Sequence, residues 1–397
     1  MVSRRRRDYT PFYLIGAMLA LWTLMHMLIG GSFYGHSFYN TYTRQAMAWR
    51  QGLLHLPEDV PYLELAVYEG EYYVSFPPLP SLVLLPFTFL FGMDTPDNLL
   101  VKLYAMGACL FLYRAFVRAG YRPQMAAAFS FLIPFSSSLL PLTLNGAVWY
   151  HAQVLGFFLS VAAVCLLTED RPTLALLCFA LSVACRPFDA LYALPLFFVY
   201  WSVNQRAGVS LKDTVRPLLP GIGLGLFVAA ALGIYNYIRF GNVLEFGHNY
   251  LPEFSTQGGI QFSIAHVGNH LKTFLWGLPL YQAEDGLKIR TFGYSMLLAC
   301  PILLLMLIWA VWDGVKRCLT REKAVLLFTF LLHAFFLLWH RTFGGYQLGS
   351  RYAVDLIPYA CFYLLLSPEK KKPAWPELLF LGLSLVFTIW GVTQVHI

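Results

Sequence analysis

Long apolar stretches, separated by short polar segments, recur along the whole chain. Each is long enough to cross about 30 Å of hydrocarbon as a helix. The polar and apolar positions do not alternate as they do in the strands of a membrane barrel. A helix is therefore expected, because it forms all its backbone hydrogen bonds within one segment in lipid. The expected spans are 11–30, 98–118, 124–143, 147–167, 172–187, 188–203, 217–237, 291–313, 324–341, 352–367 and 375–394. The pattern therefore predicts an all-α, polytopic transmembrane protein with about eleven helices.

Two longer polar segments interrupt this series, at 31–97 and 238–290. The first contains an apolar run, 80–93, which is shorter than a membrane span requires. If this run crossed the bilayer, the arginines that follow the next span would lie outside, against the positive-inside rule. We therefore expect a juxtamembrane helix there, in a long first outer loop of a single transmembrane domain that covers 1–397.

Clusters of Lys and Arg set the orientation of the predicted helices. The N-terminal cluster Arg4 to Arg7 precedes an apolar run that lacks a small-residue cleavage site, so we interpret this run as the first membrane helix rather than a signal peptide. With this cluster in the cytoplasm, the cations of later loops also fall inside. They are Arg118, Arg171, Arg206, Lys212, Arg216, Lys316, Arg317, Arg321, Lys323 and Lys370 to Lys372. Glu64, Gly258 and Ile397 are then predicted to lie outside.

The composition supports lipid as the solvent: 58% of residues are hydrophobic and 12% are charged, against about 25% charged in a soluble protein. The net charge of +7 is spread over short clusters between apolar spans, so it indicates orientation rather than nucleic acid as a partner. The seven cysteines lack CxxC spacing, and we interpret them as core residues. No nucleotide-binding, zinc-protease or serine-hydrolase motif occurs.

Four arginines gather at the predicted outer ends of helices, against the positive-inside trend: Arg186, Arg239, Arg341 and Arg351. Arginine binds phosphate through two parallel hydrogen bonds and stays charged. Arg351, with Tyr352 beside it, is the first choice for a phosphate ligand, followed by Arg239 and Arg186. The alternative is that these arginines pair with Asp189, Glu245 and Asp355 or extend to lipid headgroups.

Further candidates lie in the outer loops and at the same helix ends. Tyr68, His151 and Tyr346 are expected to contact a substrate. Glu64 lies among apolar and aromatic neighbours in the first loop, a setting that suits a general base. His36 is the second candidate for the base. A solvated carboxylate and hydrogen-bonded structural histidines are the alternatives at these positions.

Several segments together resemble the GT-C superfamily of membrane glycosyltransferases. They are Tyr39 with Arg44, Tyr68–Tyr73, Phe76–Pro80, Cys185–Pro187, Tyr235–Gly241, Glu245–Gly247 and Gly344–Tyr352. The later segments are similar to bacterial members related to family 39 and to the aminoarabinose-transferase-like enzymes. The resemblance implies a polyprenyl-phosphate sugar donor, an acceptor that is a lipid, glycan or protein, and a bacterial inner membrane with the N-terminus in the cytoplasm.

This sequence departs from the family pattern at the start of the first loop. The family's aspartate usually precedes the arginine matching Arg44 by about nine residues, but Tyr34–Ser37 contains no acid. The family's base therefore has no counterpart, which favours Glu64, then His36, and leaves a divalent metal open. A transporter or flippase for a lipid-linked saccharide is the main alternative, and it should show inverted repeats and polar groups near the midplane. The third hypothesis is a non-catalytic scaffold protein.

Overall fold

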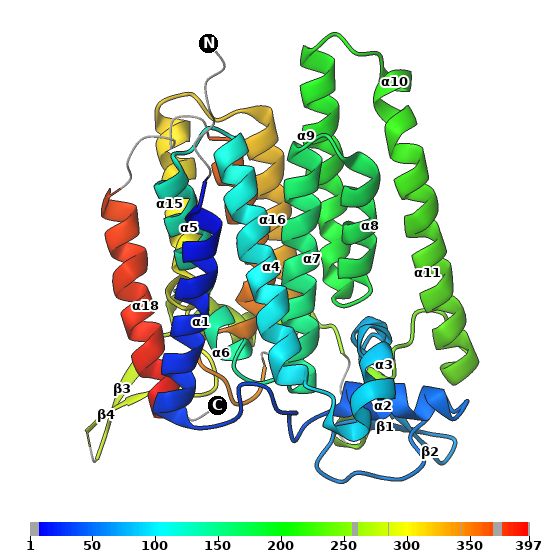
Figure 1. Cartoon of the computed structure of the whole chain (residues 1–397). Helices are drawn as coiled ribbons and strands as arrows, with labels where there is room; N and C mark the ends of the chain where they lie inside the picture. The colour runs from blue at the N-terminus through cyan, green and yellow to red at the C-terminus, as the bar shows by residue number, and fades with distance from the viewer. Residues whose placement is uncertain (1–7, 256–260, 285, 343, 368–374, 396–397) are drawn as a thin grey trace.

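The computed structural model describes residues 8–255, 261–284, 286–342, 344–367 and 375–395 (Figure 1). Some positions used in the topology prediction lie outside the described residues: Arg4 to Arg7, Gly258, Lys370 to Lys372 and Ile397. The rest of the chain forms a helical bundle with folded loops at one end. That end is called the loop end below.

The bundle reproduces the predicted spans as helices. They are α1 (Thr10–Ile29), α4 (Asp97–Arg118), α5 (Pro123–Phe135), α6 (Leu139–Leu142), α7 (Val148–Thr168), α8 (Pro172–Val183), α9 (Ala193–Arg206), α11 (Leu219–Phe240), α15 (Pro301–Val315), α16 (Arg321–Trp339), α17 (Ile357–Leu365) and α18 (Trp375–Val395). Short elements join them: η2 (Pro187–Tyr192), α10 (Leu211–Val215), η3 (Arg216–Leu218), α14 (Met296–Ala299) and η5 (Arg351–Leu356). In the described residues, six helices are long and apolar enough to cross a membrane, and shorter apolar helices lie beside them. The polytopic all-α prediction is confirmed.

Local sequence explains where several helices begin and end. α5, α8 and α15 each start on a proline, which has no N–H to leave unsatisfied in the first turn. The span predicted at 124–143 is divided because α5 contains Pro134 and ends one residue later. The span expected from 291 begins at Met296, where the Ser295 side chain accepts a hydrogen bond from the Leu297 N–H and caps the helix.

The first loop stays at the end of the bundle where α1 finishes. The Asn98 N–H donates to the Gly35 carbonyl at 3.3 Å, and the Ser37 N–H donates to Asp97 at 2.7 Å, so the chain leaves α1 and enters α4 at the same end. Between them, α2 (Thr41–Arg50) and α3 (Leu79–Phe91) lie together at that end, and η1 (Gly92–Asp94) follows (Figure 1). The predicted juxtamembrane helix at 80–93 is therefore confirmed.

Two small hairpins at the loop end were not expected from the sequence. They are formed by β1 (Leu65–Tyr68) with β2 (Glu71–Val74), and by β3 (Leu280–Ala283) with β4 (Gly286–Ile289). The first turns through Glu69 and Gly70, with φ of 52° and 85°, the left-handed pair that a two-residue hairpin turn requires. The second outer loop also contains η4 (His248–Tyr250), α12 (Pro252–Ser255) and α13 (Ile264–Trp276).

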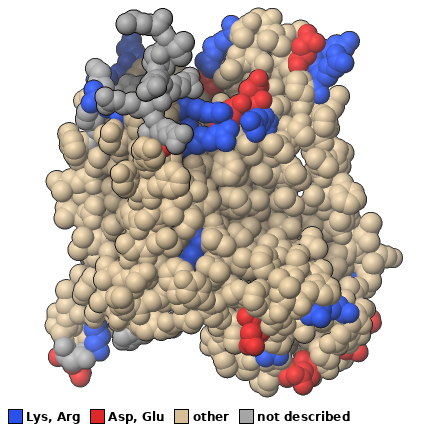
Figure 2. Space-filling model, viewed as in Figure 1, with Lys and Arg blue, Asp and Glu red and all other residues tan. Residues whose placement is uncertain are grey.

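Matched ion pairs occupy the opposite end of the bundle, called the ion-pair end below. Arg114 and Arg118 lie 2.7 and 2.9 Å from the Glu169 carboxylate. Arg206 lies 2.9 Å from Glu322, and further along Lys323 lies 2.8 Å from Asp313. Figure 2 shows charges gathered at both ends of the molecule and a broad surface between them with only one small basic patch. This distribution is the one expected of a bundle that spans a membrane.

The cysteines follow the prediction with one exception. All seven are free, and most are buried within the bundle. Cys318 is exposed, so its interpretation as a core residue is wrong. It lies in the short connection between α15 and α16, where the chain leaves the apolar layer and no neighbouring helix covers the side chain.

Candidate active site

A cavity of about 390 Å³ opens at the loop end, where segments far apart in the sequence meet. Its polar lining includes Ser75 from the first loop, Arg186 from the start of η2, and Tyr352 from η5. The second outer loop contributes Asn249 and Gln261. Apolar side chains, among them those of Phe76, Phe188 and Leu337, complete the wall. A largely apolar cavity with a few convergent polar groups is the usual form of a ligand site.

Arg186 is held in this cavity by Asp355. Its Nε and Nη2 atoms donate to one Asp355 oxygen at 3.0 and 2.6 Å. The other Asp355 oxygen accepts from Gln153 at 3.2 Å. The structural alternative considered for the arginines thus holds for Arg186, whose charge is matched by Asp355. Among the described residues, none accepts a hydrogen bond from its Nη1 atom, which leaves one donor for a ligand.

Arg351 differs because no carboxylate within the described residues lies at ion-pair distance from it. Its side chain is buried, and its Nε atom has no hydrogen-bond partner there. The guanidinium lies 5.2 Å from the centre of the Tyr352 ring, and Arg186 lies 5.3 Å from the same ring. Tyr352 therefore brings one matched and one unmatched arginine together. A buried cation without an acid partner is a strong candidate for an anionic ligand.

Glu64 does not line this cavity itself, but it contacts a residue that does. The Trp149 indole N–H donates to the Glu64 carboxylate at 2.9 Å, which fixes its position. The hydroxyl of Ser75, a lining residue, donates to the Glu64 carbonyl at 3.3 Å. Burial, and then the charge of Glu64, raise the pKa of Glu253 in the second outer loop. Glu64 is thus linked through Ser75 to the wall of the arginine cavity, and its role as the base stays a prediction.

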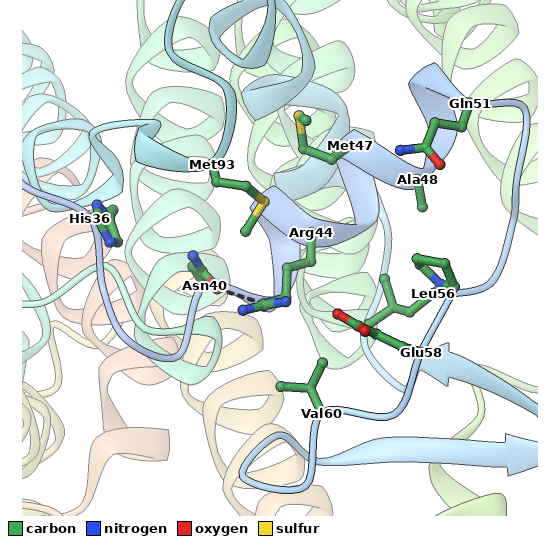
Figure 3. Close-up of a pocket in the computed structure, with 11 residues that line it drawn as sticks. His36, Asn40, Arg44, Met47, Ala48, Gln51, Leu56, Glu58, Val60 and Met93 are labelled. Carbon is green, nitrogen blue, oxygen red and sulfur yellow. Dashed lines mark hydrogen bonds between the residues drawn. The ribbon is translucent and has the colours of Figure 1, made fainter.

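His36 lies elsewhere in the first loop. Its imidazole is 3.5 Å from Asp94 in η1, and its side chain is partly exposed. It lines a second cavity, which does not include Arg186 or Tyr352 (Figure 3). The structure therefore separates the two candidates for the base, and Glu64 is the one that contacts a lining residue of the arginine cavity.

His151 is fully buried and belongs to a polar cluster behind the cavity wall. Neither ring nitrogen has a hydrogen-bond partner in the described residues. The rings of Tyr42 and Tyr104 lie 6.0 and 5.4 Å away, and their hydroxyls are also unpartnered. The Tyr42 ring in turn lies 6.3 Å from that of Phe76, a lining residue. Buried polar groups are nearly always satisfied, so this cluster is suited to hold water or a polar ligand.

Arg239 connects the first hairpin to α11. Its Nη1 and Nη2 atoms donate to the Val74 carbonyl and the Asn236 side chain, both at 3.0 Å. The guanidinium also lies 4.0 Å from the centre of the Tyr235 ring. These contacts give Arg239 a structural role in ordering the loop. It does not line the arginine cavity, and substrate binding by Arg239 stays a prediction.

Tyr68 and Tyr346 lie outside the cavity as well. The Tyr68 ring packs 4.6 Å from that of Tyr250 and joins the two outer loops. The Tyr346 hydroxyl donates to the Val395 carbonyl at 2.8 Å, near the end of α18. Substrate binding by these two tyrosines also stays a prediction.

Sequence reasoning missed a pair of histidines in the cavity wall. The rings of His248 and His340 lie 5.2 Å apart, and both line the cavity. Burial is the main cause that lowers the pKa of His248 to about 3 and that of His340 to about 4, and the charge of Arg341 lowers both values further. Both are therefore neutral near pH 7. In the described residues, no group of three or more His, Cys, Asp or Glu is arranged to hold a metal ion. No local pattern signals the pair, because it depends on how the second loop folds.

Fold and site together define an integral membrane protein with an arginine-bearing cavity beneath a folded first loop. No protein-family model matches the chain, and no curated protein matches it in sequence. The apo oligosaccharyltransferase of Archaeoglobus fulgidus is similar in structure, with a TM-score of 0.55 and 12% identity over 98% of this chain and 56% of that one. ArnT from Cupriavidus metallidurans, bound to undecaprenyl phosphate, is similar with a TM-score of 0.52 and 14% identity over 94% of this chain and 63% of that one.

These likenesses confirm the fold that the resemblance implied. The chain has the fold of the GT-C glycosyltransferases. It spans little more than half the length of the oligosaccharyltransferase and less than two thirds of ArnT. At such low identity the likeness establishes the fold alone, so the reaction has to be argued from the site.

Proposed function

We propose that this protein is a membrane glycosyltransferase, which moves a sugar from a polyprenyl-phosphate donor to an acceptor at the loop end of the bundle. The observation that carries the proposal is that Arg186 and Arg351 both lie close to the Tyr352 ring, and that Arg351 is buried without a carboxylate partner in the described residues. The GT-C fold supports it, and the structurally similar ArnT binds undecaprenyl phosphate.

The reaction is a single displacement at the anomeric carbon of the donor sugar. Glu64 accepts the proton of the acceptor hydroxyl as that oxygen forms the new glycosidic bond. The bond between the anomeric carbon and the phosphate oxygen breaks, and polyprenyl phosphate leaves with the bonding electrons. Arg351 holds the phosphate and stabilises its developing charge, while Arg186 contributes its remaining donor. Trp149 keeps the Glu64 carboxylate in place.

We also propose that the loop end faces away from the cytoplasm of a bacterial cell and that the N-terminus lies inside. The basis is the concentration of Arg and Lys at the ion-pair end. Single cysteines placed in a cysteine-depleted chain test this orientation with an impermeant thiol reagent. Position 64 should be labelled from outside, and positions 118, 206 and 316 should be protected. Labelling of position 118 from outside would contradict the orientation.

The reaction itself is tested by incubating the purified full chain with a panel of polyprenyl-phosphate sugars and a mixture of lipid, glycan and peptide acceptors, and measuring release of free polyprenyl phosphate. Sustained release is expected for at least one donor. Binding of a donor without release would contradict the enzyme and favour the carrier or scaffold alternatives. A transporter would instead move the intact lipid-linked sugar across proteoliposome membranes, which a fluorescent donor measures separately.

A further inference from the structure

A second cavity of about 530 Å³ lies in the first loop, on the outward face of α2 (Figure 3). Asn40, Arg44, Met47, Ala48 and Gln51 line it from the helix and its two caps, and the spacing of three and four residues places them on one face. Leu56, Glu58, Val60 and Met93 are also part of the lining.

The other face of α2 packs on the bundle. The Gln45 side chain donates to the Tyr235 hydroxyl of α11 at 3.0 Å, and the Trp49 ring lies 5.8 Å from the same tyrosine. The second cavity therefore faces away from the transmembrane helices. Its occupant would approach from the aqueous side of the loop end.

The polar groups of this cavity form a mixed set of donors and acceptors. Arg44 donates from Nε to Asn40 at 3.0 Å and from Nη2 to the Tyr62 hydroxyl at 3.1 Å, which fixes the guanidinium. Among the described residues, no hydrogen bond uses its Nη1 atom. Figure 3 shows the side chains of Arg44 and Glu58 extending into the same space. A carboxylate there disfavours an anionic ligand, whereas hydroxyl groups, which both donate and accept, suit the set.

An exposed aromatic pair lies beside these groups. The rings of Phe38 and Tyr62 stack with centres 4.1 Å apart, and their exposed fractions are 63% and 40%. The hydrogen bond from Arg44 joins the pair to the cavity. Exposed aromatic surface of this kind marks a contact site. The C–H face of a sugar ring can pack on a flat aromatic ring while its hydroxyls bond to Arg44, Asn40 and Glu58.

We propose that the second cavity binds a neutral saccharide chain, and that this chain is the acceptor of the transferred sugar. The acceptor role rests on the proposed glycosyl transfer. A continuous aromatic path leads from the cavity to the base: the Tyr39 ring lies 6.3 Å from that of Tyr62 and 5.0 Å from that of Trp149, which holds Glu64. A chain bound over Phe38 and Tyr62 can therefore extend its next unit toward the Glu64 carboxylate.

Saturation-transfer NMR tests the saccharide site directly. The full chain in lipid nanodiscs is mixed, without donor, with neutral hexasaccharides of glucose, galactose, mannose and N-acetylglucosamine. At least one should receive saturation, and Phe38→Ala should weaken its binding about two- to tenfold by removing one stacked ring. Tyr34→Ala is the matched control, because Tyr34 is 67% exposed in the same loop and its ring packs against Phe33 rather than Tyr62. Glu58→Ala should weaken binding as well, and the neighbouring Asp59→Ala should not.

The outcomes separate this proposal from the proposed reaction. Saccharide binding that depends on Phe38 and Glu58 supports the site, even where no donor is turned over. The site is refuted if no saccharide receives saturation, or if Phe38→Ala and Tyr34→Ala weaken binding equally. With donor present, the bound saccharide should gain one sugar by mass spectrometry. Transfer of the sugar to another acceptor, with release of polyprenyl phosphate but without elongation of the bound saccharide, would overturn the acceptor role. It would leave the proposed glycosyl transfer intact.

Discussion

Charged side chains are paired differently at the two ends of the helical bundle. At the ion-pair end, Glu169 lies between two arginines, and the buried Lys323 is matched by Asp313, which also accepts from Tyr363. At the loop end, Arg186 is matched, but Arg351 has no carboxylate at ion-pair distance in the described residues. His151 there is buried with both nitrogens unpartnered.

The difference separates polar groups that build the fold from those available to a ligand. A buried polar group without a partner costs free energy, so it persists where a ligand or water supplies the missing contact. Arg239 lies at the loop end as well, and its Nε atom also lacks a partner in the described residues, but both of its Nη atoms donate to protein groups. Hydrogen bonds to protein thus hold Arg239 in the loop, and it does not line the arginine cavity.

The largest expected effect of a substitution is on turnover, at Glu64. Glu64→Gln keeps the size of the side chain and removes proton acceptance, so the rate of sugar transfer should fall by about 10²–10⁴-fold. Donor affinity, measured by isothermal titration, should hardly change. Glu69→Gln is the control, because Glu69 is exposed in the hairpin turn. If Glu64→Gln stays active and His36→Ala is inactive, the base is His36; if both stay active, neither residue is the base.

A change of comparable size in stability is expected at the ion-pair end. Lys323→Ala leaves the buried Asp313 carboxylate without its cation, which should cost roughly 3–5 kcal/mol of unfolding free energy. Thermal unfolding in detergent measures the loss. Donor affinity at a temperature where the variant is folded should match wild type. A specific loss of donor binding would show that the ion-pair end takes part in the site.

Arg351→Ala should have a smaller effect, and on binding rather than on stability. Removal of a charge-assisted contact to phosphate should weaken donor binding by about 1.5–3 kcal/mol. Arg351→Lys should recover little of the lost donor affinity, because an ammonium group cannot form the two parallel hydrogen bonds of a planar guanidinium. The melting temperature should change little, since no described carboxylate loses its partner. Wild-type donor affinity in Arg351→Ala would mean that this arginine is structural.

The last expected effect is a pH dependence of the loop end. The pKa values of His248 and His340, about 3 and 4, lie below the ordinary value of 6.5. As pH falls, the unfolded chain therefore binds protons first, so the stability contributed by the neutral histidines is full above about pH 6.5 and declines toward pH 4. Melting temperatures between pH 7.5 and 4.5 should fall less in His340→Gln than in wild type. Equal slopes would contradict burial of a neutral His340.

The sequence predicted the helices well because each apolar stretch carries its own signal. The run at 80–93 is too short for a span, so the sequence predicted a helix in the first loop there, and α3 lies at the loop end. The first hairpin was missed because its strands are four residues long and its one strong signal, the Glu69–Gly70 turn, is brief. Short strands do not show periodicity.

The candidate site was predictable only in part. Arg186 and Tyr352 stood out as polar residues at helix ends, and both line the cavity. His248 and His340 did not, because they meet only when the loop after α11 folds against the end of α16. The sequence also could not tell that Arg186 is matched and Arg351 is not. That distinction depends on the position of Asp355 in three dimensions.

A structure of the protein in nanodiscs with undecaprenyl phosphate would test the central claim most directly. The phosphate should lie within hydrogen-bond distance of the Arg351 guanidinium, in the cavity lined by Arg186 and Tyr352. A phosphate bound at the ion-pair end, or one that leaves Arg351 without a contact, would contradict the claim that the unmatched arginine marks the lipid-phosphate site.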